Sequence, residues 1–86
     1  MYRIRFVPSA EREFLKLPQI IRNRVASHID SLAVHPRPHG CKKLAGASGH
    51  WRIRIGDYRV VYSVRDDQLL VIVVQVAHRR DVYRGL

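Results

Sequence analysis

Three arginines stand close together in the stretch 51–64, which reads Trp-Arg-Ile-Arg-Ile-Gly-Asp-Tyr-Arg-Val-Val-Tyr-Ser-Val. Arg52 and Arg54 alternate with apolar residues, which is the period of a strand with one polar face. A Gly-Asp pair at 56–57 has the residue types of a tight turn, and Arg59 follows it closely. The three guanidinium groups are therefore predicted to project from one side of a β-hairpin. A rigid cluster of this kind is typical of a phosphate-binding surface.

The charge of the whole chain agrees with a polyanionic partner. Sixteen Lys and Arg residues stand against seven Asp and Glu residues, giving a net charge of +9 over 86 residues and a sequence pI of about 10.9. No acidic residue lies between Asp30 and Asp57, whereas Lys42 and Lys43 join the arginines in this interval. Such a one-signed segment predicts salt-sensitive binding to nucleic acid. The alternative is a basic surface that only keeps the protein soluble.

The remaining composition predicts a cytoplasmic protein with no cofactor. Cys41 is the single cysteine, so no disulfide is expected and a reducing compartment is favoured. The N-terminal residues lack a signal-peptide core, and the apolar run 69–74 is too short to cross a membrane. His35, His39 and Cys41 could be metal ligands, but the loop lacks a clear fourth one, so no metal is predicted. We expect a single domain over residues 1–86.

Two helices are expected near the N-terminus, after a short alternating strand at 2–6. Ser9 is the expected N-cap of the first helix. That helix ends before Pro18, which can begin a helix but not continue one. Apolar residues at 21, 25, 29 and 32 form one stripe, and this spacing predicts a second helix over 18–34.

The second half of the chain is expected to supply the sheet. A loop is predicted over 35–49, the hairpin over 51–64, a turn at 66–67, a last strand over 69–77 and a polar tail over 78–86. Trp51 and Tyr62 share the apolar phase of the hairpin and are expected in the core. The order β-α-α-β-β-β predicts an α+β fold, with a helix hairpin packed on one face of a mostly antiparallel four-stranded sheet. The arginines would then lie on the other face.

The hairpin, the apolar strand after it and the final run His78-Arg-Arg-Asp-Val-Tyr-Arg together resemble RelE-type toxins of the RelE/ParE superfamily. The likeness includes the Lys42-Lys43-Leu44 segment and covers almost the whole chain. It implies a small RelE-like fold and the toxin of a type II toxin–antitoxin system. It also implies an mRNA interferase, a ribosome-dependent and metal-independent endoribonuclease that cuts mRNA in the ribosomal A site by 2′-hydroxyl attack. A cognate RelB-like antitoxin would silence it.

The resemblance also implies roles for individual residues. Arg59 matches the arginine at the start of the family's Tyr-Arg strand. Arg79 matches the arginine of the family's C-terminal segment, with Arg80 as the alternative. Tyr83 matches the family's C-terminal tyrosine. The expected catalytic residues are Arg54, Arg59, His78, Arg79 and Tyr83, and the expected RNA- and ribosome-binding residues are Lys42, Lys43, Arg52 and Arg80.

Arg52 and Arg54 occupy positions where family members often have lysine, and arginine does not release its proton in proteins. His78, His50 and Tyr83 are therefore the candidates for a general base or acid, with His78 preferred because it adjoins the C-terminal arginines.

Two other functions are compatible with the same residues. A ParE-like toxin shares the scaffold but inhibits DNA gyrase by binding it. A basic module could also bind nucleic acid without catalysis. The set Arg54, Arg59, Arg79 and Tyr83 favours the endoribonuclease.

Overall fold

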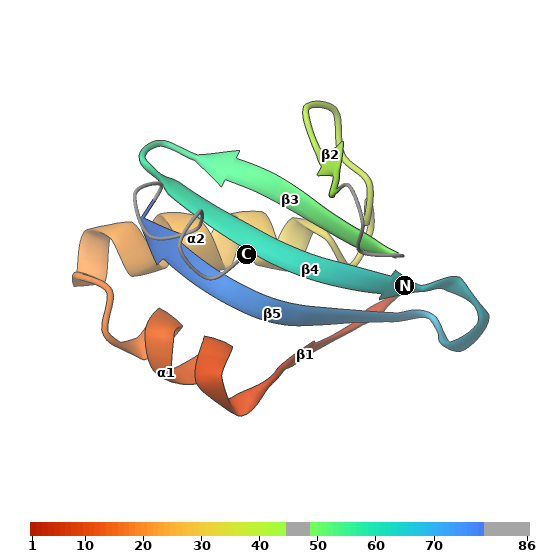
Figure 1. Ribbon diagram of the computed structural model, residues 1–86, viewed down its shortest axis with the longest axis horizontal. Coiled ribbons are helices and arrows are strands. Elements are labelled where there is room, and N and C mark those ends of the chain that lie inside the picture. The colour runs from red at the N-terminus through yellow and green to blue at the C-terminus, as the bar shows by residue number, and fades with distance from the viewer. Residues whose placement is uncertain (45–48, 79–86) are drawn as a thin grey trace.

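A five-stranded sheet forms the centre of the computed structural model, which describes residues 1–44 and 49–78. The strands lie in the order β1-β5-β4-β3-β2 (Figure 1), and only the pairing of β1 with β5 is parallel. Their bounds are β1 (Arg3–Phe6), β2 (Lys42–Lys43), β3 (His50–Ile55), β4 (Tyr58–Arg65) and β5 (Leu70–His78). The predicted α+β fold is confirmed. Within the segment expected to be a loop, the structure adds the two-residue strand β2.

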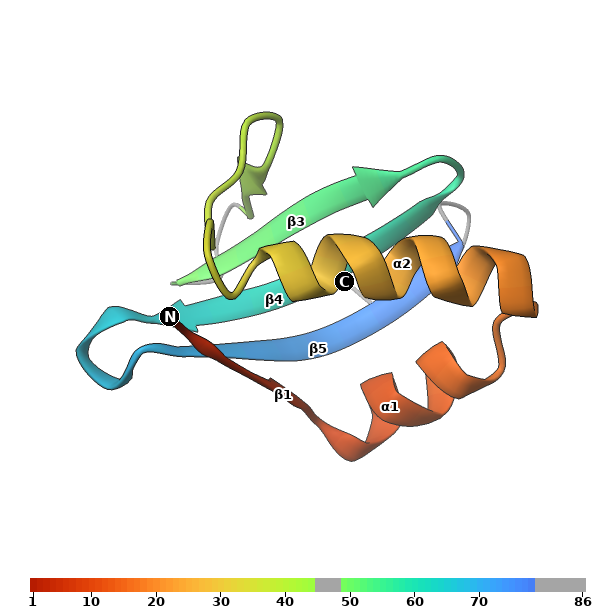
Figure 2. The same cartoon turned by 180° about the vertical axis from the view of Figure 1, so that it is seen from behind.

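Two helices, α1 (Pro8–Leu15) and α2 (Gln19–Ser31), cover one face of the sheet. Figure 2 shows α2 crossing in front of β3, β4 and β5, with α1 beside it toward β1. The core fills the space between the helices and the sheet and consists of Ala10, Val25, Ile29, Leu32, Ile53, Ile55, Val60, Tyr62, Val64, Val71, Val73 and Val76. Tyr62 is fully buried and Trp51 packs against this cluster, as predicted. No helix in the described ranges is long and apolar enough to cross a membrane.

The helix ends differ slightly from the sequence prediction. The N-cap of α1 is Val7 and carries no side-chain cap, so the prediction of Ser9 as the N-cap is wrong. Pro8 occupies the first helical position, where its missing N–H costs no hydrogen bond. Within α1, Glu13 accepts a hydrogen bond of 3.0 Å from the Val76 N–H, which ties the helix to β5. At the end of α2, the Tyr2 N–H donates to the Ala33 carbonyl over 2.8 Å.

The hairpin turns at Gly56, where φ is +60°, a conformation that glycine adopts without steric cost. Its register places Arg54 opposite Arg59. Between β4 and β5 the register shifts: Val61 pairs with Gln75, whereas Tyr62 pairs with Val73. This bulge adds one residue to β5 and reverses its alternation. Val73 and Val76 can therefore both reach the core.

Candidate functional site

The cationic side chains of the hairpin project from the face that the helices leave uncovered. Ile53, Ile55 and Val60 are buried on the helix side of the sheet. Because neighbouring side chains along a strand alternate between faces, Arg52, Arg54 and Arg59 belong to the opposite side. The predicted common face of the three arginines is therefore present in the structure.

Like charges face each other across the strands on this side. Lys42 pairs in register with Arg52, and Arg54 pairs with Arg59. Directly opposed like charges destabilise a sheet, since their Cβ atoms lie only about 5 Å apart. Several positive side chains held this close together suit a ligand with several negative oxygens.

These four side chains line one cavity of about 250 Å³, together with Gly40. No acidic residue belongs to this lining, as far as the structure describes the chain. The Arg54 guanidinium is oriented by a hydrogen bond, which its Nε donates to the Gly56 carbonyl over 3.3 Å. We name the four side chains Lys42, Arg52, Arg54 and Arg59 the cation cluster. The cluster can bind a phosphate and stabilise extra negative charge on its oxygens.

The loop that carries Gly40 and leads into β2 is tied to the far end of the sheet. Arg37 donates two hydrogen bonds to Asp66, of 3.2 and 2.7 Å, and the Tyr2 hydroxyl donates a third over 2.6 Å. The Arg37 guanidinium also lies 5.3 Å from the centre of the Trp51 ring. The hydrogen bonds from Arg37 and Tyr2 lower the pKa of Asp66 to about 2. Asp66 therefore stays ionised and keeps the loop in place.

A second tie lies deeper in the fold. The buried Tyr62 hydroxyl donates to the Pro36 carbonyl over 2.7 Å. Burial raises the pKa of this hydroxyl, so it keeps the proton that it donates. The roles of Arg37, Asp66 and Gly40 in positioning the site were not expected from the sequence. The opposite charges of Arg37 and Asp66 are the only sequence signal for their pairing. Because the two residues lie 29 positions apart, that signal does not single out this pair.

The sequence-predicted site residues do not all meet. Lys42, Arg52, Arg54 and Arg59 come together in the cation cluster. Lys43 adjoins Lys42 but pairs with Trp51 and does not line the cavity. The predicted positions Arg79, Arg80 and Tyr83 lie outside the described residues.

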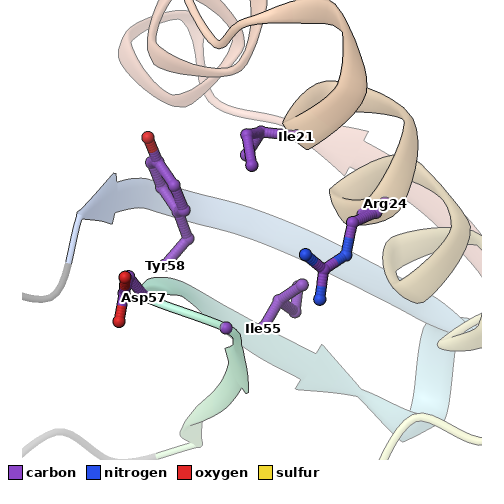
Figure 3. A pocket seen from close by; sticks show the side chains of 6 residues that line it. Ile21, Arg24, Ile55, Asp57 and Tyr58 are labelled. Atoms are coloured by element: carbon purple, nitrogen blue, oxygen red, sulfur yellow. The ribbon is translucent and has the colours of Figure 1, made fainter.

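His78 lies on the helix side of the sheet. It pairs with Tyr58, and the two rings meet edge to face with their centres 5.3 Å apart. Tyr58 in turn lines a cavity of about 180 Å³ with Ile21 and Arg24 of α2, and Figure 3 shows its ring across the cavity from these two side chains. The structure therefore does not bring His78 to the cation cluster. By strand alternation, His50 shares the face of Arg52 and Arg54 instead.

Comparison with known proteins identifies the class to which this fold and cationic surface belong. The family described as "ParE toxin of type II toxin-antitoxin system, parDE" matches residues 4–83. Toxin RelG of Mycobacterium tuberculosis is 32% identical over 84 residues, covering 96% of this chain and 97% of that protein. A putative RelE-like toxin protein of Escherichia coli is 31% identical over 86 residues, covering 95% and 90%.

Solved structures agree with this class. The isolated E. coli RelE toxin superposes with a TM-score of 0.81 at 26% identity, covering 100% of both chains. A chain of the RelBE2 toxin–antitoxin complex of M. tuberculosis gives a TM-score of 0.80 at 31% identity, covering 91% of this chain and 98% of that one. The protein belongs to the RelE/ParE superfamily of type II toxin–antitoxin toxins and is of the RelE type.

Proposed function

We propose that this toxin is a ribosome-dependent, metal-independent endoribonuclease that cuts mRNA in the ribosomal A site. The observation that carries the proposal is the cation cluster, in which four positive side chains share one cavity. A phosphodiester is the ligand whose charge and oxygen geometry suit several guanidinium groups. The relatives named RelE and RelG support the same class of activity.

In the proposed reaction, the ribose 2′-hydroxyl attacks the adjacent phosphorus and the bond to the 5′-oxygen of the next nucleotide breaks. The products are a 2′,3′-cyclic phosphate and a free 5′-hydroxyl. Negative charge grows on the phosphorane oxygens in the transition state, so preorganised guanidiniums stabilise it more than the ground state. We assign this role to Arg54 and Arg59, which face each other across the hairpin. Arg79 and Tyr83 are proposed to complete the site.

The proton of the attacking hydroxyl needs an acceptor. Arginine keeps its proton, so three members of the cation cluster do not qualify. The position of His78 beside Tyr58 argues against the role expected for it. Lys42 lines the cavity and belongs to a residue type that can exchange a proton. We therefore propose Lys42 as the proton-transfer group. The uncharged form of its amine would take the 2′-hydroxyl proton, and the resulting ammonium would give a proton to the leaving 5′-oxygen, so that the protons balance.

Replacement of Arg59 tests the proposed activity. Arg59→Ala should reduce ribosome-programmed mRNA cleavage at least ~100-fold, the scale of losing one oxyanion donor. The fold should survive, because the side chain projects away from the core. Primer extension on translating ribosomes measures the cleavage as codon-phased breaks.

Arg65→Ala is the matched control. Arg65 lies on the same strand and is exposed, but it stands roughly 20 Å farther along β4. It should leave cleavage unchanged. Undiminished cleavage by Arg59→Ala would remove Arg59 from the site, and absence of cleavage by the wild type would refute the endoribonuclease.

Gyrase inhibition is the second candidate function, because the matching family carries the ParE description. A ParE-like toxin would inhibit DNA supercoiling by purified gyrase and would leave no codon-phased breaks. A basic module without catalysis would do neither. The two assays together separate the three functions.

We infer that the physiological partners are a cognate RelB-like antitoxin, the ribosome and mRNA, all in the cytoplasm. Structural neighbours from E. coli, M. tuberculosis and Pyrococcus horikoshii are toxins in complex with their antitoxins. An antitoxin that crosses the cation cluster should be acidic there. Strand β1 lies at an edge of the sheet beside a cavity of about 380 Å³ lined mainly by apolar side chains, which suits a partner's apolar residues.

A further inference from the structure

A second cavity adjoins the cation cluster and has a different character. Its volume is about 230 Å³, and its lining includes His28 and Ser31 of α2 and Pro38 and His39 of the loop. Gly40 and Arg54 line both this cavity and the cavity of the cation cluster. The two spaces therefore adjoin, with Gly40 and Arg54 in the wall of each.

The cavity occupies a stretch of β3 that β2 leaves uncovered. Strand β2 pairs with β3 only at Trp51 and Arg52. Ile53 and Arg54 lie beyond this pairing and contribute to the lining. Pro38 and Ile53 supply apolar walls, while His39 and Arg54 supply planar groups. Single-stranded RNA bases are typically held between such apolar and planar side chains.

The polar groups along α2 present hydrogen-bond acceptors. His28 Nδ1 lies 2.9 Å from the Arg24 carbonyl, which can only accept, so Nδ1 carries the proton. In this tautomer Nε2 is an acceptor. Ser31 Oγ donates to the Ser27 carbonyl over 3.0 Å and keeps its lone pairs. The two residues are three positions apart and so lie on the same side of the helix.

We propose that this cavity is a nucleobase pocket, which holds the base of a nucleotide whose phosphate lies in the cation cluster. The inference rests on the proposed RNA-directed function. One sugar separates the base of a nucleotide from its phosphate, and two adjoining cavities with a common wall match that arrangement. Two acceptors on α2 favour a base with an exocyclic amino group. Cytosine presents its N4 amino group where uracil presents the O4 acceptor.

A leucine at position 31 tests the pocket by filling it without a change of charge. Ser27→Leu is the matched control, since Ser27 is exposed one turn earlier on the same helix and does not line the cavity. The probes are labelled oligoribonucleotides of equal length: oligo(C), oligo(U) and an abasic chain. Fluorescence anisotropy at low salt measures their affinity without the ribosome.

The wild type and Ser27→Leu should bind oligo(C) about tenfold more tightly than the abasic chain, the scale of one stacked base. They should also bind oligo(C) more tightly than oligo(U). Ser31→Leu should bind all three probes alike, with the wild-type affinity for the abasic chain. His39→Ala, which opens the pocket from the loop side, should reduce discrimination in the same direction. Circular dichroism checks that each variant is folded.

Three results would overturn the pocket. Ser31→Leu could discriminate among the probes as the wild type does, in which case the base lies elsewhere. The wild type could bind all three probes with equal affinity while Arg52→Ala lowers the affinity for each of them. This result would support the phosphate site and reject the nucleobase pocket. The wild type could bind none of the probes, which would reject the pocket and count against direct RNA binding. The ribosome cleavage assay would still test the proposed function independently of this result.

Discussion

Four positive charges lie close together on one sheet. Lys42 of β2 pairs with Arg52 of β3, and Arg54 of β3 pairs with Arg59 of β4. Like charges opposed in this way repel each other, and a phosphate can be bound between them. The four groups differ in chemistry, because an arginine holds its proton and a lysine can release it. Lys42 therefore differs from its three neighbours in what it can contribute to a reaction.

Replacing Lys42 by arginine separates charge from proton transfer. Lys42→Arg keeps the positive charge in the cation cluster, so the affinity for RNA should stay close to that of the wild type. Cleavage on the ribosome should fall about 100-fold, the lower range for loss of a general base. Single-turnover cleavage and anisotropy measure the two quantities.

Lys43→Arg is the control, since Lys43 adjoins Lys42 without lining the cavity. It should keep both cleavage and RNA affinity. A fully active Lys42→Arg variant would show that Lys42 supplies charge alone.

At the scale of elements, the cation cluster depends on how the proline-rich loop meets the sheet. Strand β2 has only two residues, so its own pairing with β3 cannot hold it firmly. The Arg37–Asp66 pair fixes the loop to the turn between β4 and β5, and Tyr62 fixes it to the core. The loop brings Gly40 and Lys42 to the cavity, so these distant contacts position the site.

The acid dependence of stability follows from Asp66. Its pKa is about 2 in the fold against an ordinary value of 3.8, so the ionised carboxylate stabilises the folded state above about pH 4. This contribution is lost as the pH falls through 2. Asp66→Asn should therefore lower the midpoint of thermal unfolding at pH 6, and the difference from the wild type should shrink toward pH 2.

Asp67→Asn is the matched control for this measurement, because Asp67 is the next residue in the same turn. Its unfolding midpoint should follow the wild-type dependence on pH. A constant difference between Asp66→Asn and the wild type from pH 6 to pH 2 would contradict the role of the carboxylate.

At the scale of the molecule, the two faces of the sheet have different tasks. The helices and the core occupy one face (Figure 2), whereas the cation cluster opens on the other. With a net charge of +9, the whole protein attracts a polyanion. The cluster determines where the backbone of that polyanion is held.

Salt dependence distinguishes general attraction from this local contact. The logarithm of RNA affinity should fall linearly with the logarithm of salt concentration. Arg52→Ala should reduce the magnitude of the slope by about 1, as expected for one lost phosphate contact. Arg12→Ala on α1 removes the same charge from the helix side and should leave the slope nearly unchanged. Equal effects of both variants would argue against a localised phosphate site.

Much of the architecture could be predicted because it depends on short-range patterns. Strict alternation from 51 to 55, the Gly-Asp turn and the apolar stripe of the second helix each reflect neighbours a few residues apart. These patterns predicted the helix pair, the hairpin and the common face of its arginines, and the structure confirms all three. The resemblance carried by the hairpin and the final segment predicted the family.

The placement of His78 could not be predicted in this way. The bulge at Val61 and Tyr62 reverses the alternation of β5, and no local signal marks the position of that extra residue. His78 directly precedes two arginines in the sequence, but this position does not determine the face of the sheet on which His78 lies. The same limit applies to β2, because a strand of two residues has no period to detect.

The sequence by itself determined the alternating faces of the hairpin, the order of helices and strands and the excess of positive charge, because these depend on residue type and local spacing. Only the tertiary structure decided which charges meet. Lys42 joins the arginines of the hairpin, and Arg37 reaches Asp66 across 29 positions, because the core between α2 and the sheet fixes how these distant segments pack. Such packing depends on contacts among residues far apart in the chain, which local patterns do not encode.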